Sequence, residues 1–242
     1  MSGVNRRRHV LTTLGLALVL LFGGVQSAFA WVEYVIRTRP STYHYGNSGY
    51  IDVFSGSPAF QDQKVTAIET SKTNKTGWCE AGITYEHYSS SDPTVTKRAF
   101  IAWGTDGAYS DQILGYVSSG STHRFHVGYS ATSGAGYEAE RHYFWYDNDI
   151  VKSIPKGWVG QMTSCWPWTL NELNNTSTSA GYDNGGHFTG LRWKSNVWGQ
   201  WYSWGTVYDY ENYRMVNGIV SGPDPYYAAY AGGPNEVIVK RR

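Results

Sequence analysis

The chain has 242 residues, of which 16% are aromatic, only 16% are charged, and 28 are glycine. This composition is typical of strands and turns and unlike that of helical proteins. The formal charge is +1 at pH 7, so we expect neither a basic surface for nucleic acid nor an attraction to anionic membranes.

The first 30 residues are typical of an export signal. The basic run Arg6–Arg8 precedes the apolar stretch Val10–Val25, and Ala28-Phe29-Ala30 provides the small residues of a cleavage site. The apolar stretch has about 16 residues, whereas a membrane-spanning helix needs about 20, so a removable signal is favoured over an anchor. Its three arginines and lack of acids mean that removal changes the charge from +1 to −2. We expect residues 31–242 to form one secreted domain with no membrane attachment.

Beyond the signal, short runs of alternating apolar and polar residues are separated by turn-forming residues, which is the pattern of strands. Asp147-Asn148 is typical of a hairpin turn, and only Thr169–Asn174 could form a short helical turn. The predicted strands are Gly49–Phe54, Lys64–Glu69, Ala81–Tyr88, Lys97–Trp103, His123–Tyr129, Glu140–Tyr146, Trp158–Met162, Gly186–Trp193, Met215–Val220 and Glu236–Lys240. Without crossover helices, these strands predict an all-β antiparallel sandwich of two packed sheets.

Two cysteines, Cys79 and Cys165, are the only ones in the chain. In an exported protein such a pair predicts a disulfide. Closing a loop of about 86 residues would stabilise the fold by about 4–5 kcal/mol on the entropy model. A metal site would need closely spaced histidine or cysteine ligands, and no such motif occurs. We expect no metal and no cofactor.

Candidate chemistry centres on Glu80, because the chain lacks the motifs of serine, phosphate-binding or metal-dependent enzymes. Glu80 lies among apolar residues in the segment Trp78–Tyr85. On a strand, Glu80 and Gly82 share one face, and Cys79 lies on the other. If Cys79 points into the core, Glu80 points away from it, and Gly82 leaves room for a ligand. The alternative is an ordinary solvent-facing glutamate.

Five groups of residues follow one another between Tyr45 and Trp193. They are Tyr45-Gly46 with Gly49–Val53, Glu80-Ala81-Gly82, Arg98–Tyr109, Trp158-Val159-Gly160 with Trp166-Pro167 and Leu170, and Ala180–His187. In this order they resemble the neprosin family of secreted glutamic peptidases. The resemblance implies a sandwich of two antiparallel sheets. It also implies hydrolysis of peptides at proline in acid by two glutamates that face each other.

The resemblance assigns roles to individual residues. Glu80 matches the first catalytic glutamate, and His187 stands where the family has the second. One group would remove a proton from water while the other, protonated, polarises the peptide carbonyl. The prediction places Glu80 at the floor of a groove on one concave sheet, with His187 opposite. The proposed substrate-binding residues are Trp103 on a wall, Gly82 and Gly185 beside the pair, and Asp183.

Two function classes remain open on the sequence. The first is a glutamic endopeptidase acting on peptide or protein substrates, and the second is a non-catalytic secreted protein that binds peptide or carbohydrate. A carboxyl group within about 3–6 Å of Glu80 would favour catalysis, whereas His187 or bare backbone would favour binding. The tryptophans Trp198, Trp201 and Trp204 could form a stacking platform for a ligand or part of the core.

Overall fold

The computed structural model describes residues 32–39, 44–55, 63–72, 76–86, 95–105, 108–130, 133, 138–157, 159, 165–175, 184–195, 200–205, 209–216, 219–222 and 227–241. Every regular element among them is a β-strand. None of these residues forms a helix long and apolar enough to cross a membrane. The export signal predicted for residues 1–30 lies outside the described residues and stays a prediction.

Eight strands form the first sheet, here called sheet A. Their order across the sheet is β14-β13-β1-β10-β3-β4-β5-β6, with antiparallel neighbours throughout. Their bounds are β1 Val32–Arg39, β3 Gln63–Lys72, β4 Gly77–Glu86, β5 Thr96–Thr105, β6 Ala108–Tyr116, β10 Cys165–Asn175, β13 Asp209–Val216 and β14 Ile219–Gly222.

The second sheet, sheet B, has the order β15-β16-β11-β2-β7-β8-β9, with the short β12 paired to β11. Its neighbouring strands are antiparallel as well. The bounds are β2 Gly46–Asp52, β7 Thr122–Ser130, β8 Arg141–Tyr146, β9 Asp149–Pro155, β11 Asn184–Lys194, β12 Trp201–Ser203, β15 Tyr227–Gly233 and β16 Glu236–Arg241.

Alternation along the strands explains why the two sheets pack together. In β4 and β7, every second residue is apolar and belongs to one buried cluster between the sheets. From sheet A this cluster takes Cys79, Ala81, Ile83, Tyr85, Ile101 and Trp103, and from sheet B Ile51, Phe125, Val127, Tyr129, Phe144, Phe188 and Leu191. Residues of opposite parity in the same strands therefore point to the outer faces.

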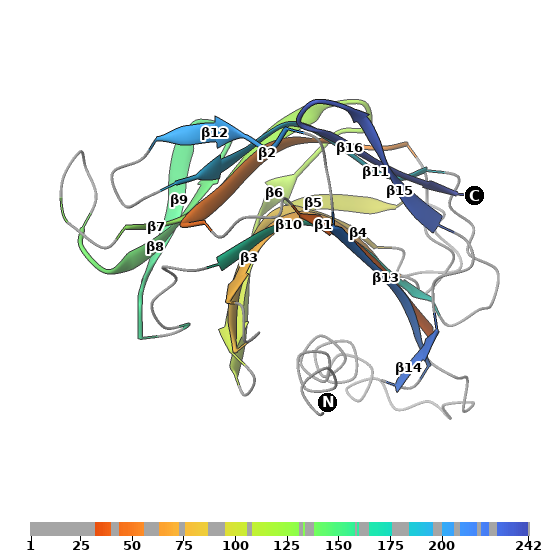
Figure 1. The fold of residues 1–242 in the computed structure, drawn as a ribbon, viewed down its shortest axis with the longest axis horizontal. Coiled ribbons are helices and arrows are strands. Elements are labelled where there is room, and N and C mark those ends of the chain that lie inside the picture. Colours follow the sequence, from red (N-terminus) through yellow and green to blue (C-terminus); the bar gives the residue numbers. More distant parts are fainter. Residues whose placement is uncertain are drawn as a thin grey trace.

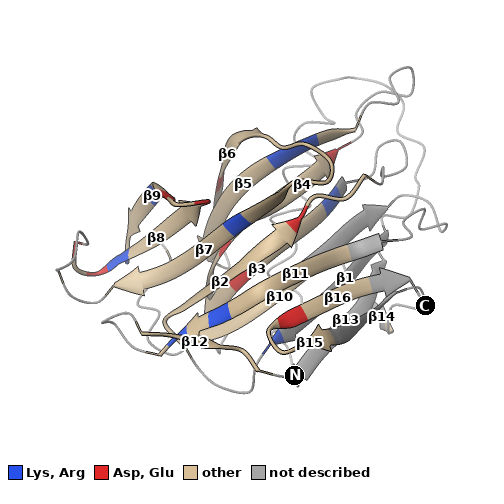
Figure 2. Cartoon of the chain, turned by 90° about the horizontal axis from the view of Figure 1, so that it is seen from above, with Lys and Arg blue, Asp and Glu red and all other residues tan. Residues whose placement is uncertain are grey.

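Sheet A curves into an arch whose convex side lies towards sheet B, so its outer face is concave (Figure 1). This outer face carries a second, smaller buried apolar cluster. Seen from above sheet B, the charged positions among the described residues are sparse and scattered over the strands, and these residues show no long run of one sign (Figure 2).

The predicted antiparallel sandwich is confirmed, and most predicted strands correspond to observed ones. Asp147 has a left-handed φ of 54° in the turn between β8 and β9, as expected for a hairpin. The helical turn predicted at Thr169–Asn174 is wrong, since these residues lie in β10 between β1 and β3. The range Met215–Val220, predicted as one strand, contains the end of β13 and the start of β14. In Trp158–Met162 only Val159 is described, and it lies in a turn.

Candidate active site

Glu80 lies on the outer, concave face of sheet A. Strand β4 is buried along its whole length, and Glu80 itself is 3% exposed. Its neighbours Cys79 and Ala81 belong to the core between the sheets, so alternation directs Glu80 away from that core. This confirms the predicted orientation of Glu80, although its side chain is buried and not solvent-facing.

The residue that faces Glu80 is Glu69. In the β3–β4 pair the two glutamates are directly opposite each other, and Glu69 is 1% exposed. Side chains in this position share one face of the sheet, with Cβ atoms about 4.5–5.5 Å apart. The concave face therefore holds a buried pair of carboxyl groups on neighbouring strands.

Apolar side chains surround this pair on the same face. The second apolar cluster consists of Val65, Ala67, Trp78, Phe100, Ala102 and Leu170, with Tyr109 packed against it. Trp168 lies opposite Glu69 on the next strand, and its indole Nε1 donates a hydrogen bond to Ser71 Oγ (3.0 Å). The indole of Trp78 and the ring of Tyr109 have centroids 5.7 Å apart. Two carboxyl groups thus lie in a weakly solvated, aromatic environment.

Gly82 has a different role from the predicted one. A Cβ atom at this position would lie 2.2 Å from the carbonyl oxygen of Thr66 and 2.5 Å from Cα of Ala67. The glycine is therefore required by the close approach of β3 to β4, and the direction of its missing side chain is occupied. This close approach occurs two residues from Glu80, in the hairpin that brings the carboxyl pair together.

His187 is not near Glu80, and the predicted Glu80–His187 pair is wrong. His187 lies in β11 of sheet B, and its neighbour Phe188 points into the core. The His187 side chain is therefore on the outer face of sheet B, on the far side of the core from Glu80. Its Nδ1 contacts Asp52 Oδ2 (2.6 Å) and its Nε2 contacts Glu236 Oε1 (2.7 Å).

The histidine in this cluster is held between two carboxylates. Partial burial alone would lower the pKa of His187, but the hydrogen bonds and charges of Glu236 and Asp52 outweigh it and raise this pKa above its usual 6.5. Asp52 also accepts a hydrogen bond from the hydroxyl of Thr122 (2.5 Å). The cluster is a half-exposed ion network, separate from the pair on sheet A.

Trp103 and Gly185, two other predicted substrate-binding residues, do not line the face of Glu80. Trp103 is 7% exposed and belongs to the core between the sheets, with its ring 5.7 Å from that of Phe144. Gly185 lies in β11 of sheet B, next to an irregularity in the pairing with β16. Asp183 lies outside the described residues. The prediction that Trp103 forms a groove wall is therefore wrong, because Trp103 is opposite Cys79 and points to the core side of sheet A.

The predicted disulfide is absent. Cys79 and Cys165 are both buried as thiols, and β3 separates their strands, with Cys79 opposite Thr70 and Cys165 opposite Lys72. Strands on either side of a third lie about 9–10 Å apart, beyond the limit of about 7 Å between the Cα atoms of a disulfide. Burial, followed by Cys165 and the nearby Glu69 and Glu80, raises the pKa of Cys79 well above its usual value.

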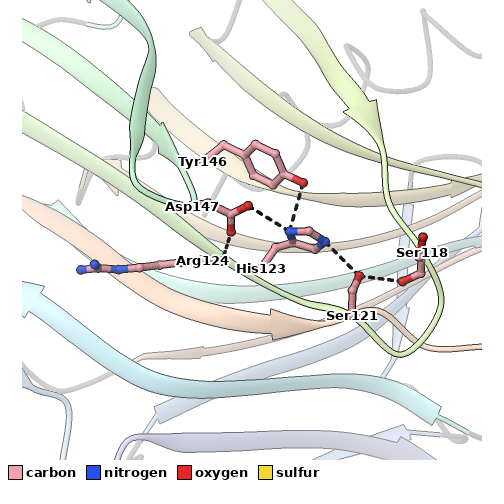
Figure 3. A network of polar contacts seen from close by, with 6 residues as sticks. All are labelled: Ser118, Ser121, His123, Arg124, Tyr146 and Asp147. Carbon is pink, nitrogen blue, oxygen red and sulfur yellow. Dashed lines mark hydrogen bonds and ion pairs between the residues drawn. The ribbon is translucent and has the colours of Figure 1, made fainter.

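A serine, a histidine and an aspartate meet at one end of sheet B (Figure 3). Ser121 Oγ contacts His123 Nε2 (2.9 Å), and His123 Nδ1 contacts Asp147 Oδ2 (3.2 Å) and the hydroxyl of Tyr146 (3.0 Å). Ser121 Oγ, however, donates its proton to the main-chain carbonyl of Ser118 (2.6 Å). His123 must then donate to Ser121, which is the reverse of a nucleophile and its base. We interpret this network as a structural link between two turns.

Among the described residues, no group of three or more histidine, cysteine, aspartate or glutamate side chains is arranged to hold a metal ion. The tryptophans predicted to form either a stacking platform or part of the core have different surroundings. Trp204 is part of the core, Trp201 makes an edge contact with His126, with centroids 4.2 Å apart, and Trp198 lies outside the described residues.

Sequence reasoning missed Glu69, although the chain contains a signal for it. Glu69 ends one predicted strand, Lys64–Glu69, and Glu80 immediately precedes the next, Ala81–Tyr88. In a hairpin, the two residue numbers of every opposed pair add up to the same value. In the observed register, residue 69 is opposite residue 80. Testing each hairpin register for opposed carboxyl groups would have found the pair.

Comparisons with known proteins address the fold. No protein-family model matches the chain, and no curated protein matches it. Among solved structures, scytalido-glutamic peptidase with a transition state analog inhibitor is similar, with a TM-score of 0.53 and 14% identity over 90% of this chain and 100% of the other. At this identity the similarity shows a shared fold, the β-sandwich of a glutamic peptidase.

Two further structures are similar at lower scores. Scytalido-glutamic peptidase with a peptide-based transition state analog has a TM-score of 0.49 and 13% identity, over 90% of this chain and 100% of that one. A member of the eqolisin family of peptidases in a complex with the tripeptide Ala-Ile-His has a TM-score of 0.42 and 13% identity, with the same coverage.

Proposed function

We propose that the protein is a secreted, neprosin-like peptidase of the glutamic type that hydrolyses proline-containing peptides in acid, with Glu69 and Glu80 as its carboxyl pair. The observation that carries the proposal is the register that places these two buried glutamates directly opposite each other on the concave face. The β-sandwich fold shared with a glutamic peptidase supports it, as do the sequence motifs around Glu80.

The pair has the chemistry that hydrolysis in acid requires. Two carboxyl groups this close do not both ionise readily, because each negative charge disfavours the other. The ionised group removes a proton from a water molecule, whose oxygen attacks the peptide carbonyl carbon. The protonated group donates its proton to the carbonyl oxygen. Collapse of the tetrahedral adduct then breaks the C–N bond: the group that took the proton from water passes it to the leaving amine, and the other group recovers its proton from a hydroxyl of the adduct.

The surroundings of the pair suit a proline-containing substrate. Proline-rich segments are stiff and apolar, and they bind aromatic surfaces at low entropic cost. Trp78 and Tyr109 lie on the same face as Glu80. Trp78 is two residues from Glu80 in β4, and Tyr109 lies level with Trp78, because both are opposite Gly104 of β5. Trp168 occupies the position beside Glu69. These side chains would contact the residues that flank the scissile bond.

The test is incubation of the secreted protein with proline-rich peptides from pH 2 to 8, read by mass spectrometry. Glu69→Gln and Glu80→Gln should each slow cleavage by about 10²–10⁴-fold and keep the fold. Glu138→Gln is the matched control, since the Glu138 side chain is 76% exposed and pairs with Arg141. Cleavage at the wild-type rate by either active-site variant would overturn the proposal. Peptide retention without cleavage by the wild-type protein would favour the binding function instead.

A further inference from the structure

Asn47 is a fully buried polar residue that connects the two sheets at the carboxyl pair. It lies in β2 of sheet B, where Val127 and Trp193 are its neighbours in register, and it is 0% exposed. Its amide Nδ2 crosses the core and donates hydrogen bonds to the main-chain carbonyls of Glu69 (3.1 Å) and Trp168 (2.8 Å). These two carbonyls belong to residues that face each other across β3 and β10.

A proline lies next to this contact in the sequence. Trp168 follows Pro167, which lies opposite Thr70 in the interior strand β10. Proline has no N–H to contribute to a sheet and is rare inside central strands. Buried carbonyl groups need a donor, and the Asn47 amide provides one to each of two adjacent strands.

Packing alone does not account for this residue. Asn47 Oδ1 is buried and has no hydrogen-bond partner among the described residues. A buried polar atom in that state is destabilising, and leucine would fill a similar volume without that penalty. A residue kept only to fill space would more easily be apolar. The two donated hydrogen bonds are therefore the feature that distinguishes asparagine from leucine at this position.

We propose that Asn47 is a positioning residue, which fixes the main chain of Glu69 so that its carboxyl group faces that of Glu80 at a set distance. This inference rests on the proposed function. The interaction between two charges in a weakly solvated site changes steeply with their separation. A small shift of β3 against β4 would therefore alter how the pair shares its proton and how it holds water.

Three variants test the inference. Asn47→Leu removes both donors and keeps the volume. Asn47→Asp keeps the shape and, while protonated in acid, retains one O–H donor. Ile51→Ala is the control for lost stability, because Ile51 is a fully buried core residue of the same strand whose neighbours are His123 and Phe188.

Two readouts are measured on each variant. The first is kcat and KM for a proline-rich peptide from pH 3 to 7, beside the melting temperature. The second is the titration of the two carboxyl groups by NMR of carboxyl-labelled glutamate, assigned with Glu69→Gln and Glu80→Gln. We expect Asn47→Leu to lower kcat about 100-fold, as for a misplacement of about 1 Å, with little change in KM and with shifted titration steps. In acid, the kcat of Asn47→Asp should lie between that of Asn47→Leu and that of the wild-type protein.

Two outcomes would overturn the inference. One is an Asn47→Leu protein with wild-type kcat and unchanged titration of the pair. The other is an Ile51→Ala protein that loses kcat and shifts the titration as much as Asn47→Leu, because the effect would then be general destabilisation. If the wild-type protein cleaves nothing, the proposed function fails, and the titration alone still decides whether Asn47 positions the pair.

Discussion

Two clusters of acidic residues lie on opposite outer faces of this sandwich, and they differ in their burial and in the residue that faces each carboxyl group. On sheet A, Glu69 and Glu80 face each other with exposed fractions of 1% and 3%. On sheet B, Asp52 and Glu236 have 33% and 30% of their side chains exposed, and His187 lies between them. The first cluster places two carboxyl groups opposite each other in a buried position, and the second places a histidine between two carboxylates nearer to solvent.

This difference decides which cluster is suited to acid–base chemistry. A carboxylate beside a protonated histidine is stabilised in its ionised form, so an ion network mainly contributes to stability. Two opposed, buried carboxyl groups instead disfavour each other's ionisation, and in the proposed function they share one proton and act as base and acid. The sequence motifs associated Glu80 with His187, whereas the structure joins each of them to different partners.

The largest expected effect is on the sheet A pair. Glu69→Gln and Glu80→Gln should each lower kcat by about 10²–10⁴-fold, the range for loss of an acid or base. The double variant should be no worse than the more damaging single variant, because the two groups act as a unit. The measurement is single-turnover cleavage of a proline-rich peptide. Additive losses in the double variant would contradict a shared-proton pair.

The next effect concerns Lys64, a buried cation of sheet A. Lys64 is 1% exposed, and burial, followed by the charge of Lys97, lowers the pKa of Lys64 from 10.5 to about 7. As pH falls from 10.5 to 7, the unfolded chain binds this proton before the folded chain does, so stability falls. Below pH 7 both states are protonated and the loss is complete.

Lys64→Met should remove this pH dependence. We expect the free energy of unfolding of the variant, relative to wild type, to rise by about 3–4 kcal/mol from pH 10 to pH 6. Urea titrations at both pH values provide the measurement. A constant difference between the two proteins would show that Lys64 stays charged when folded.

A smaller effect is expected for the sheet B cluster. Because its pKa is raised in the fold, His187 contributes stability that is fully present below its unfolded pKa of about 6.5 and is lost as pH rises through the folded value. His187→Gln should cost about 0.5–1 kcal/mol at pH 5.5 and less at pH 9. Thermal melting at both pH values tests this. An equal loss at both would assign the effect to packing.

The sequence predicted features that depend on alternation within one strand. The sandwich, most of its strands and the opposite directions of Cys79 and Glu80 all follow from a period of two. What it could not supply was long-range pairing. Nothing local in Thr169–Asn174 indicates that it lies between β1 and β3, and the order of motifs does not show that His187 belongs to the other sheet. The placement of Trp103 on a groove wall was an avoidable error, because Trp103 lies an even number of residues from the core residues of β5 and so points to the same side.

The smallest expected effect is that of a reductant, and it tests how the strands of sheet A are ordered. A disulfide between Cys79 and Cys165 would contribute about 4–5 kcal/mol, so its reduction would lower the melting temperature markedly. With β3 between their strands, the two residues are too far apart to be joined, and we expect dithiothreitol to leave the melting temperature unchanged.

Both thiols are buried, and burial raises the pKa of Cys79, so the native protein should react slowly with a thiol reagent. In denaturant without reductant, both should react. A protein with no reactive thiol in denaturant would require β4 and β10 to be neighbours, and Glu69 could then not lie between Trp168 and Glu80.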